Sequence, residues 1–487
     1  MEAYLKKIEE CITGGPFRDD WGSLGNFEAP AWFRSAKFGI FVHWGLYSVP
    51  AFSNEWYPRN MYIKDTPEYC HHISTYGEHK TFGYKDFIPL FTAERFNAGE
   101  WTSLFRKAGA RYIVAVAEHH DGFQMYKSDI SRYNAYEKGP KRDILGEIKK
   151  AAAAQGLHFA VSSHRAEHWF FMGGGKNFDS DIREPLCRGD FYWPAMPEPS
   201  HNDLCGSPYP TQEYLQDWLA RTCELIDRYC PALLYFDWWI QHEAFKPYIR
   251  KLAAYYYNRG VQWNRSVAIT YKHDAMMFGS AIVNIERGRF AQAKPYVWQT
   301  DTSIARNSWC YTDNLDLKSA REILCGLIDT ISKNGNFLLN VGPKPDGSIS
   351  DNERDILEEI GRWMELNGEA VYSSKVWRIS GEGPTVEAEG QFSEAEKDYT
   401  REDFRFTVRG SSIYVFALRY PEDGRVLIRA LADSTDQNRP DFHGLIKDVK
   451  VLGFNEKPEW HKSEKGLAIK TKTVKSGLPI VFDIKLS

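Results

Sequence analysis

The sequence predicts an α/β protein, a somewhat irregular (β/α)8 TIM-like barrel followed by a C-terminal all-β sandwich. Eight short apolar segments end in polar or aromatic residues, and helix-like segments lie between most of them. After about Val371 these apolar and helix-like segments give way to runs rich in β-branched residues, in which apolar and polar residues alternate. Strands that alternate with helices are typical of parallel sheets, and eight of them can close a barrel. We therefore place the barrel at residues 1–370 and the sandwich at residues 371–487.

The eight predicted barrel strands are largely apolar runs, which are typical of strands buried on both faces. They are Phe38–Gly45, Tyr112–Gly122, His158–His164, Leu233–Trp239, Ser266–His273, Ile282–Gly288, Tyr296–Thr302 and Asn336–Pro343. An open doubly wound sheet is the alternative. The glycine-rich motif G-x-G-x-x-G that such dinucleotide-binding sheets carry does not follow the first strand, so the barrel is favoured.

Helical patterns separate most of these strands. Arg142–Gly156 is the clearest, because it combines an alanine run with a terminal glycine, where helices commonly stop. The others are Ala98–Ala110, Pro210–Tyr229, Phe245–Gly260, Leu315–Gly335 and Asp351–Glu369. The connections after strands five and six are short. The connections at 46–97 and 166–210 are longer than is needed to join a strand to a helix. Long loops at the carboxyl ends of barrel strands commonly form the walls of a substrate pocket.

The C-terminal part predicts strands broken by Gly, Asn and Asp, which is typical of a small sandwich. The strands fall within Phe404–Tyr420, Arg425–Ala430, Val449–Leu452, Leu467–Lys472 and Pro479–Lys485. No cluster of catalytic residue types lies among them, so we expect an accessory domain.

The composition describes a globular chain and disfavours several partners. Of 487 residues, 43% are hydrophobic and 26% charged, and the net charge of -4 offers no attraction for nucleic acid. No apolar run is long enough to cross a bilayer, so no membrane partner is expected. The N-terminus resembles a short amphipathic helix without the apolar stretch of a signal peptide, which predicts a cytoplasmic protein unless a leader was removed. The sequence leaves open whether the chain forms a homo-oligomer.

Asp237 is the first candidate site residue, because it follows the apolar run Leu233–Phe236 and precedes two tryptophans. Aspartate is rare in strands and costly to bury unpaired, and catalytic groups of barrels lie at the carboxyl ends of the strands. A turn or helix-capping aspartate is the alternative. The other strand ends favour a site, since they add His43, His119, His120, His164, Lys272 and Glu286.

Two carboxylates on different strands favour glycoside hydrolysis. A retaining enzyme uses one as nucleophile and a second, about 5–5.5 Å away, as acid and then base. Asp237 is the natural nucleophile, and Glu286 can reach it from a nearby strand. Glu55, in the loop after the first strand, is the second candidate for the acid. Aromatic residues, at 15%, are numerous enough to line a sugar pocket.

The histidines raise a metal-dependent hydrolase as an alternative. A barrel metallohydrolase favours H-x-H at the end of its first strand, where this chain has His43-Trp44-Gly45. His119 and His120 are adjacent, so on a strand their rings would point to opposite faces. We therefore predict no metal and no cofactor. A sugar-binding protein with decayed catalysis is the third hypothesis, and the presence of Asp237 argues against it.

Several ordered motifs resemble the family 29 glycoside hydrolases, the retaining α-L-fucosidases. The matching segments, which span roughly residues 30–372, are Lys37–Gly45, Tyr47–Pro50, Glu55–Tyr57, Glu118–Phe123, Phe236–Asp237 and Asn334–Pro343. The resemblance implies a barrel followed by a sandwich, without metal or cofactor. It also implies cleavage of terminal α-L-fucosyl linkages in fucosylated oligosaccharides or glycoconjugates through a covalent fucosyl-enzyme intermediate.

For the site, the resemblance implies Asp237 as nucleophile. It implies that the side chains of His43, Glu55, Trp56, His119 and His120 surround the fucose. Tyr235 occupies the position where the family usually has an aromatic residue of the pocket. Some positions depart from the family pattern. Trp298-Gln299 and Ser308-Trp309-Cys310-Tyr311 differ from its usual W-E and S-W-G-Y. His164 is the candidate replacement for its tyrosine, and Lys272 for its arginine after strand five. The acid/base is the least transferable residue of the family, and Glu286 and Glu55 both remain candidates.

Overall fold

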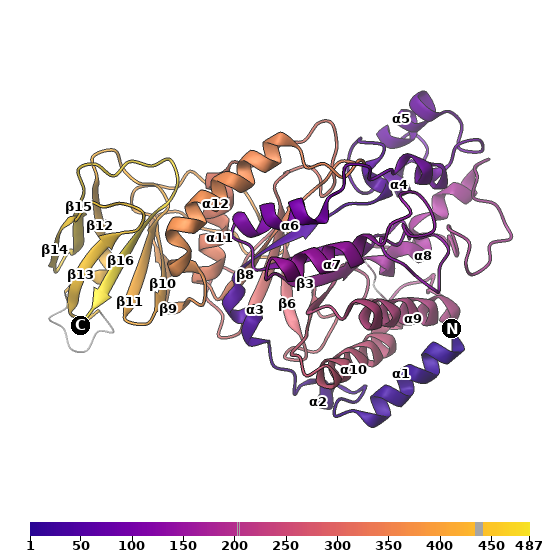
Figure 1. Ribbon diagram of the computed structural model, residues 1–487, viewed down its shortest axis with the longest axis horizontal. Helices are drawn as coiled ribbons and strands as arrows, with labels where there is room; N and C mark the ends of the chain where they lie inside the picture. Colours follow the sequence, from indigo (N-terminus) through magenta and orange to yellow (C-terminus); the bar gives the residue numbers. More distant parts are fainter. Residues whose placement is uncertain (202, 204, 434–441) are drawn as a thin grey trace.

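The computed structural model describes residues 1–201, 203, 205–433 and 442–487, and within these ranges it confirms the predicted fold class. Two residues of the long 166–210 connection therefore lie outside the described residues. Eight parallel strands close into a barrel in chain order, with β8 paired back to β1. In Figure 1 the barrel strands and their helices lie to the right of the C-terminal strands, which are drawn in yellow. They are β1 (Phe38–Val42), β2 (Tyr112–Glu118), β3 (His158–Ser163), β4 (Leu233–Phe236), β5 (Ala268–Tyr271), β6 (Ile282–Glu286), β7 (Trp298–Ser303) and β8 (Gly335–Val341).

Each barrel strand is shorter than its predicted range, and in most of them the polar residues at the carboxyl end lie outside the sheet. β4 ends at Phe236, so Asp237 is the first residue beyond it. β2 ends at Glu118, so His119 and His120 are not in a strand. The expectation that their rings point to opposite faces is therefore wrong: the ring centroids lie 4.3 Å apart, and both rings face one cavity.

The predicted helices form around the barrel, and in five of the six a polar side chain caps the first turn. They are α6 (Ala98–Lys107), α7 (Ile144–Ala154), α9 (Gln212–Tyr229), α10 (Lys246–Gln262), α11 (Ala320–Ser332) and α12 (Asp351–Val371). Asn97, Asp143, Thr211, Ser319 and Ser350 each accept a hydrogen bond from the first helical turn. The connections 272–281 and 287–297, which follow β5 and β6, are short and form no helix.

The N-terminal segment forms the amphipathic helix α1 (Glu2–Gly14), which packs on α9 and α10. Shorter helices lie in the connections: α2 (Trp21–Leu24), α3 (Ala31–Ala36), α4 (Tyr57–Asn60), α5 (Pro67–Tyr76) and α8 (His168–Phe171). Among the helices of the described ranges, none combines the length and the apolar character needed to cross a bilayer.

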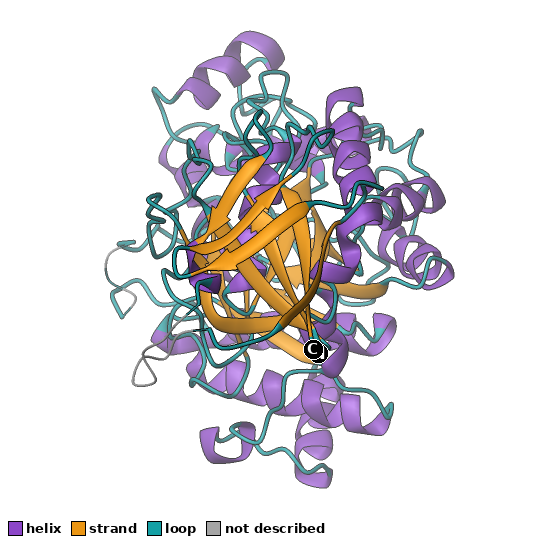
Figure 2. Cartoon of the chain, turned by 90° about the vertical axis from the view of Figure 1, so that its left-hand side faces the viewer, coloured by secondary structure: helices purple, strands orange, loops and turns teal. Residues whose placement is uncertain are grey.

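The C-terminal strands form two antiparallel sheets, in the orders β13-β16-β11-β10-β9 and β12-β15-β14. Figure 2 views the chain from the side of this sandwich. The strands are β9 (Lys375–Glu382), β10 (Phe404–Arg409), β11 (Ser412–Ala417), β12 (Arg425–Ile428), β13 (Ile446–Val451), β14 (Glu459–Ser463), β15 (Gly466–Lys470) and β16 (Ile480–Leu486). The sequence did not predict β9 and β14. Both are edge strands without a fully buried face, so they lack the alternation that identifies a strand.

A buried ion cluster on α11 joins the barrel to the sandwich. Asp329 is fully buried and accepts hydrogen bonds from Lys333 Nζ at 2.7 Å and from Arg405 Nε of β10 at 2.6 Å. A third cation, Arg289 Nη1, lies 3.6 Å away. Burial raises the pKa of Asp329, but the three cations outweigh burial and hold this pKa well below its ordinary value. The division of the chain at residue 370 stays a prediction.

Replacing Asp329 by asparagine is expected to lower the free energy of unfolding by about 3–5 kcal/mol at pH 7, because buried cations would lose their counter-charge. Since the pKa of Asp329 is depressed, this stabilisation is present above the ordinary aspartate pKa of about 3.9 and is lost as the pH falls toward the folded value. Urea unfolding of both proteins between pH 7 and pH 3 measures the difference, which should shrink below about pH 4.

The matched control is Asp355→Asn on the exposed face of α12, which should change the unfolding free energy by less than about 0.5 kcal/mol. A wild-type unfolding midpoint for Asp329→Asn at pH 7 would contradict the role of the cluster.

Candidate active site

A cavity of about 160 Å³ lies at the carboxyl ends of the barrel strands. The structure brings together all of the site residues that the sequence predicted: His43, Glu55, Trp56, His119, His120, His164, Tyr235, Asp237, Lys272 and Glu286 line this one cavity. Most of them end a strand or follow its last residue, while Glu55 and Trp56 come from the loop after β1. Parallel strands in a closed barrel direct their carboxyl ends to one rim, which explains how residues far apart in sequence meet.

Asp237 is held by cationic and imidazole groups in this cavity. Its Oδ1 accepts a hydrogen bond from Lys272 Nζ at 2.6 Å, and its Oδ2 lies 2.8 Å from His164 Nδ1 and 3.4 Å from His120 Nε2. Burial raises the pKa of Asp237, but Lys272 and the two histidines lower it well below the ordinary value. Asp237 is therefore an oriented, ionised carboxylate.

Lys272 bridges two carboxylates. Its ammonium, in a side chain that is 1% exposed, donates to Asp237 Oδ1 and to Glu286 Oε2. Burial lowers the pKa of Lys272, but Asp237 and Glu286 raise it well above its ordinary value, so the ammonium stays charged. The two bridged oxygens lie within two hydrogen-bond lengths of each other, a separation compatible with the roughly 5–5.5 Å between the carboxyl groups of retaining glycosidases.

The histidines divide into neutral and charged rings. Burial lowers the pKa of His43 and His119 well below the ordinary value, and it lowers that of His164 to about 4. Burial also acts to lower the pKa of His120, but Glu167 and Asp237 raise it to about 9. At neutral pH one imidazolium therefore lies beside Asp237, and neutral rings that can donate and accept hydrogen bonds line the rest.

Glu55 is buried on the other wall of the cavity. Its Oε2 accepts a hydrogen bond from the backbone N–H of Trp309 at 2.9 Å. Burial raises the pKa of Glu55 despite this bond. By contrast, Glu286 shares a cation with Asp237 and accepts a 2.6 Å hydrogen bond from Trp238 Nε1.

Two groups in the cavity have the donor atoms for a metal ion. Their ligand atoms lie within 4.8 Å of one another: one group is His43, His119 and His164, and the other is His120, His164 and Asp237. His164 belongs to both groups, and both of its ring nitrogens already contact protein atoms, Nδ1 at Asp237 and Nε2 at Ser162 Oγ at 2.9 Å. A metal would have to displace these contacts, so the donor set fits a hydrogen-bond network better than a metal site.

The cavity also contains side chains that the sequence analysis did not select: Glu167, Trp238, Asp301, Trp309 and Phe392. Trp238 and Asp301 are each the last residue but one of a predicted strand, so their positions at the rim could be predicted from the sequence. Asp301, on β7, is a buried carboxyl whose pKa is raised by burial to about 7. Phe392 gives no such signal, because it lies beyond the predicted barrel.

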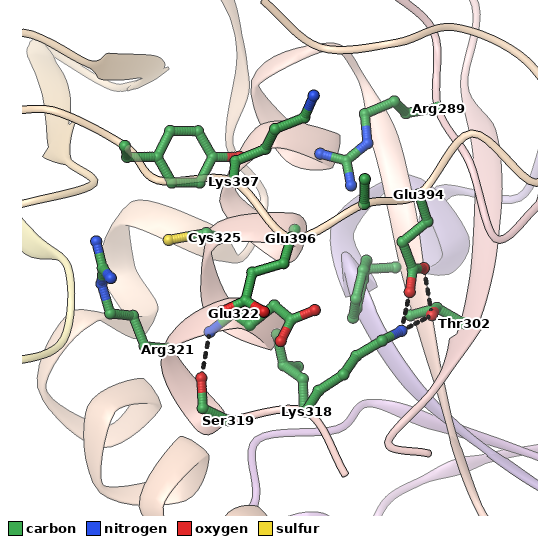
Figure 3. Close-up of a pocket in the computed structure, with 15 residues that line it drawn as sticks. Arg289, Thr302, Lys318, Ser319, Arg321, Glu322, Cys325, Glu394, Glu396 and Lys397 are labelled. Atoms are coloured by element: carbon green, nitrogen blue, oxygen red, sulfur yellow. Dashed lines mark hydrogen bonds and ion pairs between the residues drawn. The ribbon is translucent and has the colours of Figure 1, made fainter. Parts of the chain in front are cut away.

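Phe392 reaches the cavity on residues 386–399, which we call the return segment. The backbone N–H of Phe392 donates to the carbonyl of Glu286 at 2.8 Å, and the N–H of Glu394 donates to that of Arg287 at 2.8 Å. Farther along, Lys318 donates to Glu394 at the edge of a second, smaller cavity (Figure 3). The return segment thus contacts the backbone of a predicted catalytic residue directly.

Comparisons with known proteins show which proteins this chain resembles. The chain matches the family model Alpha-L-fucosidase over residues 5–369 and the model Alpha-L-fucosidase C-terminal domain over residues 396–486. Tissue alpha-L-fucosidase of Homo sapiens is 30% identical over 441 residues, which are 89% of this chain and 85% of that protein. Plasma alpha-L-fucosidase of Homo sapiens is 28% identical over 471 residues, which are 91% of this chain and 86% of that protein. The crystal structure of Thermotoga maritima alpha-fucosidase in complex with fucose is 29% identical and superposes with a TM-score of 0.74 over 96% of this chain and 100% of that one.

Proposed function

The chain belongs to the α-L-fucosidase family and is a retaining glycoside hydrolase of terminal α-L-fucosyl linkages; we propose that Asp237 is its nucleophile and Glu286 its acid/base. The observation that carries this assignment is the ammonium of Lys272, which holds both carboxylates at once. Fucosylated oligosaccharides or glycoconjugates are the substrates we propose.

In the first step, a carboxylate oxygen of Asp237 forms a bond to C1 of the fucosyl unit. The bond between C1 and the leaving oxygen breaks, and Glu286 gives that oxygen its proton. In the second step, Glu286 takes a proton from water, the water oxygen bonds to C1, and Asp237 is released. Two displacements at C1 leave its configuration unchanged.

Lys272 contributes to both steps. Its charge keeps Asp237 ionised for attack. Once the ester forms, the charge of Asp237 is neutralised, and Lys272 is left with Glu286 as its anionic partner. The ammonium then stabilises the carboxylate of Glu286, which serves as general base. The same cation therefore stabilises the anion of Asp237 in the first step and that of Glu286 in the second.

The remaining predicted residues are assigned to the sugar. The neutral rings of His43 and His119 can exchange hydrogen bonds with hydroxyl groups, and Trp56 and Tyr235 offer apolar faces. Both ring nitrogens of His164 already contact Asp237 and Ser162, so His164 is proposed to orient Asp237 beside the sugar. Glu55 is proposed to bind a hydroxyl group, because Trp309 fixes it away from the Lys272 bridge.

The direct test is hydrolysis of an aryl α-L-fucoside followed by NMR from the first turnover. We expect α-L-fucose as the initial product and unchanged activity after dialysis against EDTA. Activity that is lost to EDTA and restored by Zn²⁺ would support the metal-dependent hydrolase instead. Binding of fucose without turnover would support a binding protein.

A further inference from the structure

The return segment, residues 386–399, pairs with the chain that carries Glu286 out of β6. The backbone N–H groups of Gly390 and Phe392 donate to the carbonyls of Arg289 at 2.9 Å and of Glu286 at 2.8 Å. The two backbones approach so closely that a Cβ at Gly288 would lie 1.8 Å from the carbonyl oxygen of Gly390. Glycine is therefore needed at position 288 for this pairing to form.

The side chain of Gln391 adds a second contact with the backbone of Glu286. Its Oε1 accepts a hydrogen bond from the backbone N–H of Glu286, and its Nε2 donates to the carbonyl of Asn284 at 3.3 Å. The pairing of β5 with β6 ends at Val283, so the return segment takes the place of a strand partner for Glu286. Both backbone polar groups of the residue assigned as acid/base are thus bonded to two successive residues from outside the barrel strands.

Phe392 also acts on the carboxylate end of Glu286, through Trp238. Trp238 Nε1 donates a 2.6 Å hydrogen bond to Glu286 Oε2. The ring of Phe392 lies nearly parallel to the indole, with an angle of 10° between their planes and 6.0 Å between their centroids. Phe392 is 59% exposed, so burial in a core does not explain its position. The ring instead limits the movement of the indole that holds the carboxylate.

Two residues where these backbones meet have strained conformations. The φ angles of Arg287 and Phe392 are 41° and 53°, in the left-handed region that residues other than glycine rarely adopt. Such conformations persist where the surrounding contacts enforce them, and they concentrate at functional sites. The strain indicates that the contacts enforce the position of Phe392 against Glu286.

Ion pairs anchor the return segment on both sides of its contacts with the chain after β6. On one side, Glu387 accepts a hydrogen bond from Arg289 Nη1 at 3.1 Å. On the other side, Glu394 accepts hydrogen bonds from Lys318 Nζ and from Thr302 Oγ1 of β7 (Figure 3). Lys318 is buried, and its Nζ also donates to Thr302 Oγ1 at 2.6 Å. The return segment is therefore fixed both to β7 and to the chain after β6.

We propose that the return segment is a positioning element for the acid/base: Gln391 fixes the backbone of Glu286, and Phe392 fixes its carboxylate through Trp238. A general acid must lie within hydrogen-bond reach of the leaving oxygen, and a displacement of about 1 Å lowers the rate strongly. In this role the return segment acts only through Glu286. This inference rests on the proposed function, which assigns the acid role to Glu286.

A double-mutant cycle tests this role with phenyl α-L-fucoside, whose leaving group needs a proton. For Gln391→Met, which keeps the length of the side chain but neither hydrogen bond, we expect kcat/KM to fall about tenfold, the loss typical of one buried hydrogen bond. In the Glu286→Ala background the same change should cost less than about twofold, because no acid is left to position. Gln292→Met, on the exposed part of the connection after β6, is the matched control and should leave kcat/KM unchanged in both backgrounds.

A series of aryl α-L-fucosides, each with a single ring but with leaving groups of graded pKa, tests both contacts. The losses in kcat/KM for Gln391→Met and for Phe392→Ala should each grow as the leaving-group pKa rises, and stay below about twofold for the most activated aryl group. Lost contact with the aryl ring itself would lower all members equally, so the slope of the series is specific for protonation. Phe278→Ala is the matched control for Phe392→Ala, because Phe278 is 60% exposed, and it should keep the wild-type slope.

A loss for Gln391→Met that is equal in both backgrounds would overturn the proposal, since Gln391 would then act independently of Glu286. Wild-type slopes for Gln391→Met and Phe392→Ala would overturn it as well. Because Phe392 is exposed, Phe392→Ala is expected to fold and decides the outcome if Gln391→Met does not. Failure of the proposed function has a different signature: Glu286→Ala itself would then keep the wild-type slope, and the positioning role would fall with it.

Discussion

Replacing Asp237 by glycine is expected to lower kcat at least about 10³-fold while the barrel still folds, because the bond to C1 can no longer form. Lys272 would keep its ion pair with Glu286, so this buried cation would not be left without a counter-charge. Steady-state hydrolysis of an aryl α-L-fucoside measures the loss. Circular dichroism of the variant checks the fold.

Azide separates a lost nucleophile from a damaged site. Azide fits the space of the missing carboxylate, so it should restore turnover of Asp237→Gly and yield the β-L-fucosyl azide, opposite in configuration to the substrate. Asp237→Asn, which keeps the shape of the side chain but not its charge, should be as inactive in the absence of azide. An azide product of the substrate's own configuration would rule out Asp237 as nucleophile.

For Glu286→Ala we expect a loss that depends on the leaving group. General acid catalysis typically contributes about 10²–10⁴-fold, so hydrolysis of fucosylated oligosaccharides should fall by that order. Fluoride and highly activated aryl groups leave without protonation and should be affected much less. A series of aryl fucosides with leaving groups of graded pKa measures this dependence, which should steepen in the variant.

Glu55→Ala is the matched control for that experiment, since Glu55 lies in the same cavity and is also a buried glutamate. If Glu55 only binds a hydroxyl group, its removal should lower kcat/KM similarly for good and poor leaving groups. A leaving-group dependence in Glu55→Ala, with equal losses in Glu286→Ala, would transfer the acid role to Glu55.

Much of the site could be predicted because the position of a residue at the end of a strand in the sequence determines its position in the barrel. Each strand is an apolar run that ends in polar residues, and a closed parallel barrel brings those ends to one rim. Asp237, His164 and Lys272 each follow the last residue of a strand, so the sequence alone placed them together. The family motifs then indicated the chemistry.

Contacts between distant residues could not be predicted in the same way. The bridge from Lys272 to Asp237 and Glu286 depends on how side chains from three strands extend over the rim. Likewise, Phe392 reaches the cavity only because the return segment pairs with the backbone after β6. No local pattern encodes that pairing, since its partners are far apart in the sequence: Phe392 pairs with Glu286, and Glu394 with Arg287.

By itself, therefore, the sequence determined the barrel, the sandwich, the rim residues and the family, because apolar periodicity and short motifs are local properties of the chain. The tertiary structure decided which carboxylates share a cation, which imidazoles are charged and which segment from beyond the barrel completes the cavity. Those features depend on distances of a few ångströms and on burial, and both arise only when remote segments pack against one another.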